Sequence, residues 1–600
     1  MAAPPPARST WILPDLLPAA VLDPLIGPGA PFELVDEKVL GQELQVFVNR
    51  PRTLREMFDR SVAAADDLEF LVSPTGTWTF GRAREAIDRI AAELVERHGI
   101  GPGDRVGFIS ANSAEYGLAM WAALSVGAII TSLNGWWTAD EIRYGIDLTT
   151  PSIVLGDVRR LERVAQADRA SVPVRSLDDL VATALARADA ATPPAVQIDE
   201  DDPVVILFTS GTTGRPKGAT LSHRNILHLA MISQLGARIA AAMARPAPTE
   251  APANTKPNPT QPNPTQPNAT HPRQPASILS SPMFHVSGML GILMTGPLFG
   301  TRLVFAPPGA WDETRHLELT EQHRITGWSG VPTQWWRIVR HPGLGEYDLS
   351  SLRSIGGGGA PLAPELVHEL TQRFPGVTLA NGYGMSETVG NGTLIAGPML
   401  VAMPDSVGGA QAGIEVEIRD PLGDTMAEGA VGEIHIRGAS VFIGYWGDDD
   451  ATAESLDADR WYRTGDFGRI EGGMLFLESR MRDLILRGGE NIYPMEVENR
   501  LVAHPDIDDA AVIGVDHPVL GQEVKAFVVL RSGAELTTSD IQVWVGETLA
   551  PFKVPAHVEV RADLPYTDTG KVLKQDLERQ ELESRQRARA LDPDTDRTTT

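Results

Sequence analysis

The segment VVILFTSGTTGRPKGATLSH, residues 204–223, constrains the fold more than any other part of the chain. Its apolar run Val204–Phe208 predicts a buried strand, which leads directly into a loop of small and hydroxyl residues that contains Lys217. Small residues allow backbone N–H groups to surround phosphate oxygens, and hydroxyl groups and a lysine add further donors. We therefore predict a phosphate-binding loop made of Thr209, Ser210, Gly211, Thr212, Thr213, Gly214 and Lys217.

The two most common nucleotide fingerprints are missing from the sequence. Neither the Walker A pattern nor GxGxxG occurs in the 600 residues. The loop therefore indicates a third class of nucleotide-binding α/β protein.

Helical patterns and short β-rich runs alternate from about Leu54 to Phe305, which is typical of α/β layers with a largely parallel sheet. The uncharged stretch Tyr116–Ala139 approaches the length of a membrane span, but small and polar residues interrupt its second half. We interpret it as a buried helix followed by a core strand. After Arg480 the elements become short and mixed, which predicts a small α+β domain.

Two segments do not fit a packed core. Residues 244–275 are rich in Pro and Asn and have no apolar periodicity, so we expect a disordered, solvated insertion there. The end of the chain is a charged helix that runs into the polar sequence DPDTDRTTT. The predicted organisation is a large domain (1–480), a small domain (481–580) and a flexible tail (581–600).

Charge and cysteine content exclude several classes of function. The net charge is −26, which disfavours nucleic acid as the main partner. Because the chain has no Cys, it has no disulfide, thiolate nucleophile or Cys-ligated zinc. The first twenty residues lack an uninterrupted apolar run, so we expect no signal peptide and a cytoplasmic location.

Five further motifs follow the phosphate loop in a fixed order. They are SIGGGGAPL from Ser354, NGYGMSET from Asn381, WYRTGD from Trp461, SRMRDLILRGGENIYPMEVE from Ser479 and TDTGKVLK from Thr567. With the loop, these motifs resemble the adenylate-forming superfamily of acyl-CoA synthetases, luciferases and nonribosomal-peptide adenylation domains. The resemblance implies a large multi-subdomain adenylation domain and a small mobile C-terminal domain, with ATP, Mg²⁺ and coenzyme A as cosubstrates.

The resemblance also implies roles for individual residues, several of which fit their chemistry. Tyr383 offers a ring to stack on adenine, Glu387 a carboxylate for Mg²⁺, and Asp466 two oxygens for the ribose hydroxyls. Thr388 is expected beside the α-phosphate. The other implied nucleotide and coenzyme contacts are Gly358, Gly359, Ala360, Asn381, Gly382, Arg480, Gly488 and Gly489.

Two implied residues belong to the moving part of the mechanism. Arg482 stands at the hinge of the small domain, where many relatives have Asp or Lys. Lys571, in the loop Asp568–Lys571, corresponds to the lysine that stabilises charge developing at the α-phosphate during adenylation.

The acyl pocket is expected around the run PMFHVSGM, residues 282–289, and the run GVPTQWW. His285 stands where amino-acid-adenylating relatives have an Asp, so no anion is offered to a substrate ammonium. Val286, Val331 and Trp335 would line an apolar channel, although such residues also form ordinary cores.

The sequence thus predicts an ATP-dependent acid–CoA ligase, with a medium- or long-chain fatty acid as substrate ahead of steroid side-chain or aryl acids. Two alternatives stay open, an adenylation enzyme that loads a separate carrier protein and a nucleotide-binding scaffold without activity. We expect no transmembrane segment, peripheral membrane contact stays open, and the oligomeric state has no signal in the sequence.

Overall fold

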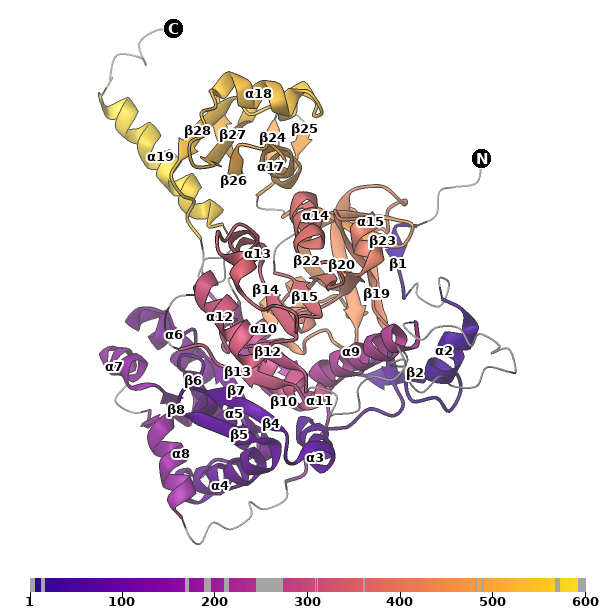
Figure 1. Ribbon diagram of the computed structural model, residues 1–600, viewed down its shortest axis with the longest axis vertical. Helices are drawn as coiled ribbons and strands as arrows, with labels where there is room; N and C mark the ends of the chain where they lie inside the picture. Colours follow the sequence, from indigo (N-terminus) through magenta and orange to yellow (C-terminus); the bar gives the residue numbers. More distant parts are fainter. Residues whose placement is uncertain are drawn as a thin grey trace, which may run out of the picture.

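The computed structural model describes residues 6–11, 17–167, 172–187, 196–209, 215–243, 274–307, 309, 311–359, 362–480, 483–487, 490–566 and 572–591. The protein has a mixed α/β fold with a large N-terminal domain and a small C-terminal domain that lies at one end of the molecule (Figure 1). The predicted fold class is confirmed. The predicted domain boundaries stay predictions, because the presumed hinge lies outside the described residues.

The first sheet of the large domain carries the phosphate-loop strand near its centre. Among the described residues its strands lie in the order β21 (Gly444–Tyr445), β11 (Lys217–Ser222), β10 (Pro203–Thr209), β7 (Ile129–Ser132), β6 (Arg105–Ile109), β8 (Ile153–Gly156) and β9 (Val174–Ser176). From β10 to β9 the strands are parallel, and β11 and β21 extend the edge in antiparallel pairing. This agrees with the predicted parallel sheet.

Helices alternate with these strands, as the sequence predicts. They are α3 (Leu54–Ala65), α4 (Phe80–His98), α5 (Ala114–Ser125), α6 (Ala139–Thr149), α7 (Val158–Gln166) and α8 (Leu177–Ala186). The stretch Tyr116–Ala139 forms the buried helix α5 and the fully buried strand β7, so its interpretation as core is confirmed.

The second sheet spans most of the large domain. In the part of the chain described, its order is β1 (Arg8–Ser9), β19 (Ile414–Arg419), β20 (Gly432–Gly438), β22 (Tyr462–Glu471), β23 (Met474–Arg480), β18 (Ser406–Ala410), β17 (Thr393–Ala396), β16 (Thr378–Tyr383), β15 (Ser354–Gly357), β14 (Gly327–Gly330), β12 (Ala276–Ile278), β13 (Arg302–Val304), β4 (Glu69–Ser73) and β5 (Gly76–Thr79). The strands from β16 to β4 are parallel, whereas the β1 half is antiparallel.

The remaining helices of the large domain connect and cover the sheets. They are α2 (Ala19–Ile26), α9 (His223–Met243), α10 (Val286–Leu290), the π-helical turn Gly291–Thr295, α11 (Gly296–Phe299), α12 (Glu313–His323), α13 (Pro332–Val339), α14 (Pro364–Arg373), α15 (Pro398–Ala402) and α16 (Asp449–Ser455). Among the described helices only α9 is long and apolar enough to cross a bilayer, and 50% of its apolar window is buried inside the protein.

The small domain has a core of its own. Its strands are β24 (Ile485–Arg487), β25 (Glu490–Ile492), β26 (Ile507–His517), β27 (Gly521–Leu530) and β28 (His557–Arg561), and its helices are α17 (Pro494–Val502), α18 (Thr538–Gly546) and α19 (Lys574–Leu591). Successive residues of β26 face opposite sides of the sheet, so Val512 packs in one apolar cluster and Ile513 in another. Every buried residue of these two clusters lies at or after Ile485.

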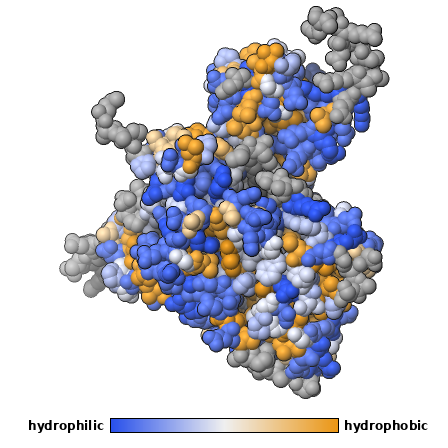
Figure 2. Space-filling view, turned by 180° about the vertical axis from the view of Figure 1, so that it is seen from behind, coloured by the Kyte–Doolittle hydropathy of each residue, from blue (hydrophilic) through white to orange (hydrophobic). Residues whose placement is uncertain are grey.

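The expected charged helix near the end of the chain is α19, and it overlaps the predicted tail. Helix α19 continues through Leu591, past the expected start of the tail at 581. Glu581 anchors it, because its carboxylate accepts from Lys525 at 2.6 Å and from Arg585 at 2.7 Å. The predicted insertion at 244–275 lies outside the described residues except for Gln274 and Pro275. Figure 2 shows a largely hydrophilic surface with scattered apolar patches, as expected for a net charge of −26.

Candidate active site

Strands β10 and β11 form the two sides of the predicted phosphate loop. Their register pairs Phe208 with Gly218 and Thr209 with Lys217, so the hydroxyl and the ammonium stand opposite each other where the loop begins and ends. Residues Val204–Leu207 are buried, which fixes the strand between layers of the core. The loop residues Ser210–Gly214 lie outside the described part of the chain.

Glu387 closes this site from another element. It lies in a short 3₁₀ turn, Ser386–Thr388, and is only 5% exposed. Its Oε1 accepts a hydrogen bond from the Thr209 hydroxyl at 3.2 Å and one from the Tyr445 hydroxyl at 2.9 Å. The structure therefore joins three segments far apart in sequence around one carboxylate.

The charge of Glu387 is incompletely compensated. Burial raises the pKa of its carboxyl group, and the hydrogen bonds and the positive charge of Lys217 offset this only in part. The Lys217 ammonium stands 5.0 Å from the centre of the Tyr445 ring, a cation–π distance. A buried carboxylate held by hydroxyl groups is a suitable partner for an added cation.

Mg²⁺ fits this site as an ion held jointly by Glu387 and the phosphates of the substrate. Within the described residues no group of three or more acidic or histidine side chains is arranged to hold a metal. Mg²⁺ needs no such cage, since it is commonly held by one or two carboxylates together with substrate phosphates and water. Glu387 beside the phosphate loop supplies the one carboxylate.

Tyr383 and Asp466, both predicted nucleotide contacts, meet in the structure. The Tyr383 hydroxyl donates to Asp466 Oδ2 at 2.9 Å, and the Tyr383 ring is 7% exposed. Asp466 lies in β22 directly after Gly465, whose φ of +70° turns the strand. The two residues form the second half of the site.

Tyr462 connects the two halves. Burial raises its pKa well above the usual value, and the neighbouring Glu387, Tyr445 and Tyr383 raise it further. Phe442 adds a backbone link, because its N–H donates to the Glu387 carbonyl at 2.8 Å. The Glu387 half and the Tyr383 half of the site therefore both lie near the buried Tyr462 hydroxyl.

The glycine-rich segment lies beside the NGYG motif as predicted. Strand β15 runs parallel to β16, with Gly357 opposite Asn381, and a Cβ on Gly358 would stand 3.6 Å from the Gly382 carbonyl oxygen. Gly359 has a φ of +77°, which disfavours other residues. Asn381 is buried, and its Oδ1 has no hydrogen-bond partner among the described residues, so an acceptor is available for a ligand donor.

Thr388 stabilises the turn that carries Glu387. Its hydroxyl accepts from the Met385 N–H at 3.1 Å, which closes the turn that carries Glu387. Gly384 is required in the same loop, because a Cβ there would lie 2.4 Å from the Asn391 nitrogen. The NGYGMSET motif thus folds as a tight loop that presents Glu387 to β10.

The acyl-pocket residues divide into two groups. Val286 reaches the site, since a Cβ on Gly390 would lie 3.4 Å from its Cγ1, and His285 packs 4.7 Å from the Phe284 ring. Val331 precedes α13, whereas Trp335 is 1% exposed and stacks on Trp328 in the second core of the large domain. The pocket role of Trp335 stays a prediction, and its observed contacts are those of a core residue.

Several predicted residues lie outside the described part of the chain. The described strand β23 includes Arg480, whose backbone pairs with Asp466, but its side chain is not described. Beyond the loop, the others are Ala360, the hinge residue Arg482, Gly488, Gly489 and Lys571.

The sequence analysis missed two aromatic residues. Tyr445 binds Glu387, and Trp136 packs against Phe284 at 4.7 Å and His285 at 6.1 Å while 40% of it stays exposed. An unusual Trp-Trp pair after Asn134 was the available signal for Trp136. For Tyr445 nothing local signals a contact with Glu387.

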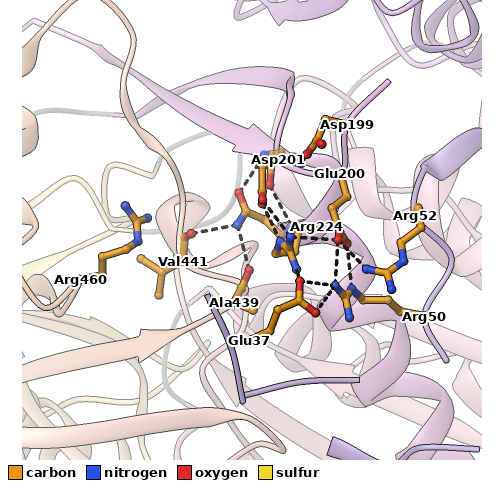
Figure 3. A network of polar contacts seen from close by, with 12 residues as sticks. Glu37, Arg50, Arg52, Asp199, Glu200, Asp201, Arg224, Ala439, Val441 and Arg460 are labelled. Carbon is orange, nitrogen blue, oxygen red and sulfur yellow. Dashed lines mark hydrogen bonds and ion pairs between the residues drawn. The ribbon is translucent and has the colours of Figure 1, made fainter. Parts of the chain in front are cut away.

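A buried ion cluster supports the other end of β10 (Figure 3). Glu200 accepts from Arg50 at 2.8 Å, from Arg52 at 2.6 Å, and pairs with Arg224 at 2.9 Å. Glu37, from the hairpin β2 (Leu34–Val39) and β3 (Gln42–Phe47), binds both Arg50 and Arg224. The cluster fastens this hairpin to the segment before β10 and to the start of α9.

Comparisons with known proteins agree with this geometry. The AMP-binding enzyme profile matches residues 58–446, and the AMP-binding enzyme C-terminal domain profile matches residues 496–571. A feruloyl-CoA synthase from Amycolatopsis sp is 30% identical over 505 residues, covering 84% of this chain and 93% of the relative.

A mitochondrial medium-chain acyl-CoA ligase from Macaca fascicularis is 29% identical over 543 residues, with 84% of this chain and 82% of the relative covered. The crystal structure of ATP-bound MatB from Rhodopseudomonas palustris matches with a TM-score of 0.73 at 28% identity, over 88% of this chain and 98% of that one.

Proposed function

The chain belongs to the AMP-binding enzyme family and is an AMP-forming acid–CoA ligase, and from this premise we propose that its acid is a medium- or long-chain fatty acid. The observation that carries the nucleotide half of the proposal is the buried contact of Glu387 with Thr209 beside Lys217. It sets a carboxylate for Mg²⁺, a hydroxyl and an ammonium around one phosphate loop.

The proposed reaction has two steps. The acid carboxylate attacks the α-phosphorus of ATP, which forms acyl-AMP and releases pyrophosphate. The CoA thiol then attacks the acyl carbon, which forms the thioester and releases AMP. Neither step needs a covalent bond to the enzyme, in keeping with a chain that has no Cys.

In the adenylation step each residue acts on a different part of ATP. Lys217 and the loop donors neutralise the phosphate oxygens. Glu387 would hold Mg²⁺, which would supply Lewis-acid polarisation when bound. Asn381, with its unpartnered Oδ1, can accept from the purine, and Asp466 can accept from the ribose hydroxyls. We assign Lys571 to the charge that develops at the α-phosphate.

The choice of a fatty acid rests on the lining near His285. The rings of Phe284 and Trp136 pack beside His285 and Val286 follows it in sequence, and none of these three side chains offers an anion to a polar acid. A medium-chain acyl-CoA ligase among the relatives supports the same class. We extend the proposal to a cytoplasmic location, supported by ATP and CoA as substrates and by the lack of Cys.

An aryl acid is the second candidate, favoured by one observation. Trp136 meets Phe284 edge to face with ring centres 4.7 Å apart, and 40% of Trp136 is exposed. A flat ring could pack on this aromatic surface.

A panel of carboxylic acids decides between the candidates. ATP- and CoA-dependent AMP formation should be fastest with C8–C16 fatty acids, and faster turnover of cinnamic-type acids would favour the aryl candidate instead. CoA is compared with a carrier protein as acceptor in the same assay. Without pyrophosphate release for any acid, the ligase assignment itself would fail.

Lys571→Ala separates the two steps. The adenylation rate should fall on the order of 10²–10³-fold, as after loss of one preorganised donor. Conversion of supplied acyl-AMP and CoA should stay near the wild-type rate, because that step does not use the ammonium. Survival of ATP-dependent activation would overturn the assignment of Lys571.

A further inference from the structure

A cavity of about 370 Å³ lies between the two domains, away from the nucleotide site. Arg340 and Arg373 line it from α13 and α14 of the large domain, and Asp508 and Arg531 line it from β26 and the end of β27. The two helices lie on the side of the large domain that faces the small one (Figure 1). Its size falls in the usual range for small-molecule sites.

The arginines around this cavity are poorly neutralised. The side chains of Arg373 and Arg531 are exposed and have no hydrogen bond or ion pair within the described residues. Arg340 donates through Nη1 to the Asp508 side chain and, at 3.4 Å, to the Asp508 carbonyl. Within the described residues its Nε and Nη2 are buried without a hydrogen-bond partner, and the guanidinium lies over the Trp336 ring at 4.0 Å from the ring centre.

Neighbouring charges act on Arg340 in both directions. Burial lowers the pKa of Arg340 and the positive charge of Arg531 from the opposite wall lowers it further, while the negative charges of Glu369 and Asp509 offset this in part. Glu369 and Asp508 are the two carboxylates among the lining residues, against three arginines. In a chain with a net charge of −26, this local excess of positive charge is a distinct feature.

Guanidinium groups on opposite walls favour one kind of ligand. The planar fork of arginine binds two oxygens of a phosphoryl group at once, and two such groups in one ligand match two separated arginines. We propose that this cavity binds a diphosphate group. The source is either free pyrophosphate or the diphosphate of a nucleotide-containing cofactor.

Such a ligand would act on the arrangement of the domains. Its contacts come from both domains, so it binds the described domain orientation more tightly than an orientation in which the cavity is taken apart. This difference in affinity stabilises the described orientation. The Arg340–Asp508 ion pair already connects the same two surfaces. The inference does not require the ligase activity proposed above, and none of its residues belongs to the nucleotide site.

Binding is tested by calorimetry with inorganic pyrophosphate, without Mg²⁺ and at fixed ionic strength, on full-length protein carrying Lys217→Gln to weaken the phosphate loop. Adding Arg373→Gln with Arg531→Gln should weaken binding about tenfold or more, the usual effect of losing charged hydrogen bonds. The matched control, Arg159→Gln with Arg238→Gln, removes two exposed arginines outside the cavity and should leave affinity unchanged.

Equal affinities in the two double variants would overturn the site. ADP in place of pyrophosphate separates the sources when only the affinity lost in the Arg373→Gln with Arg531→Gln variant is compared, because ADP also binds the nucleotide site. A larger loss for ADP indicates a nucleotide diphosphate, and a larger loss for pyrophosphate indicates the free ion. All four arginine positions are exposed, so we expect folded variants, and thermal denaturation checks this.

Domain orientation is measured by fluorescence energy transfer. Because the chain has no Cys, Leu422→Cys in the large domain and Val543→Cys in the small domain provide the only two labelling sites, and these residues are 87% and 61% exposed. Pyrophosphate should shift the transfer efficiency when Arg373 and Arg531 are present and leave it unchanged in their double Gln variant. A bound ligand without any shift would overturn the coupling to domain orientation.

Discussion

Two buried carboxylates stand at opposite ends of strand β10, and the fold treats them in opposite ways. Glu200, just before the strand, is 9% exposed and surrounded by three arginines. Glu387, where the strand enters the phosphate loop, is 5% exposed, and its side-chain donors within the described residues are two hydroxyl groups.

The pKa values of the two carboxyl groups shift in opposite directions, as their partners predict. Burial raises the pKa of Glu200, but its hydrogen bonds and charge interactions with arginines outweigh burial and bring the pKa below the usual value. For Glu387 burial prevails and the pKa is raised. A compensated charge holds the strand in place, whereas an uncompensated one keeps affinity for a cation that arrives with the substrate.

Removal of the Glu387 charge should have the largest effect. Glu387→Gln keeps the size of the side chain but removes the Mg²⁺ ligand, so pyrophosphate release should fall on the order of 10²–10³-fold. The melting temperature should stay equal or rise, because a poorly compensated buried charge is gone. A stable variant with near-normal activity would refute the role of Glu387.

The same substitution at Glu200 should have the reverse profile. Glu200→Gln leaves Arg50 and Arg224 with less compensation in a buried site and should cost about 3 kcal/mol of unfolding free energy. The activity of the folded fraction should remain near normal. Denaturant titration gives the free energy, and Glu85→Gln on the exposed face of α4 is the control with no expected change.

Tyr445→Phe tests how much of the behaviour of Glu387 comes from its hydroxyl partner. Loss of this hydrogen bond to a charged group should reduce the adenylation rate about tenfold, with the loss expressed mainly as a higher Mg²⁺ requirement. Titration of Mg²⁺ at saturating ATP measures it. If the Mg²⁺ dependence is unchanged, the hydroxyl group does not prepare Glu387 for the metal.

The smallest effects should appear in the pH dependence of stability. The contribution of Glu200 is present above its unfolded pKa, near 4.5, and is lost as the pH falls through the lower folded value. The stability advantage of wild type over Glu200→Gln should therefore shrink below pH 4.5.

For Glu387 the folded pKa is raised, so the sign is opposite. Protonation stabilises the fold at low pH, and this contribution is lost as the pH rises through the folded pKa. Glu387→Gln should gain stability relative to wild type with rising pH, and melting curves from pH 4 to 8 check both trends.

Local patterns predicted much of this fold but little of its long-range pairing. The apolar run before the phosphate loop predicted β10, and the alternation of helices and strands predicted the parallel sheet. Glu200 lies in the run DEDD, which resembles an ordinary solvated charge cluster. Its partner Arg50 is 150 residues away in sequence, a distance at which spacing carries no signal.

The same limit explains the missed residue of the site. Tyr445 reaches Glu387 across 58 positions through the pairing of β21 with β11. The strand pairing places Tyr445 beside Glu387, and the residues next to Tyr445 in sequence do not indicate this contact. Motif order identified Glu387, Tyr383 and Asp466, but their mutual contacts came from the sheets.

The separate core of the small domain has a consequence for how the sequence of the protein evolves. Since the buried residues of its two apolar clusters all lie at or after Ile485, a substitution inside that core need not be matched by a change in the large domain. The two parts can therefore accumulate substitutions independently, and coevolution is expected mainly at the few polar positions that join them, such as Arg340 and Asp508.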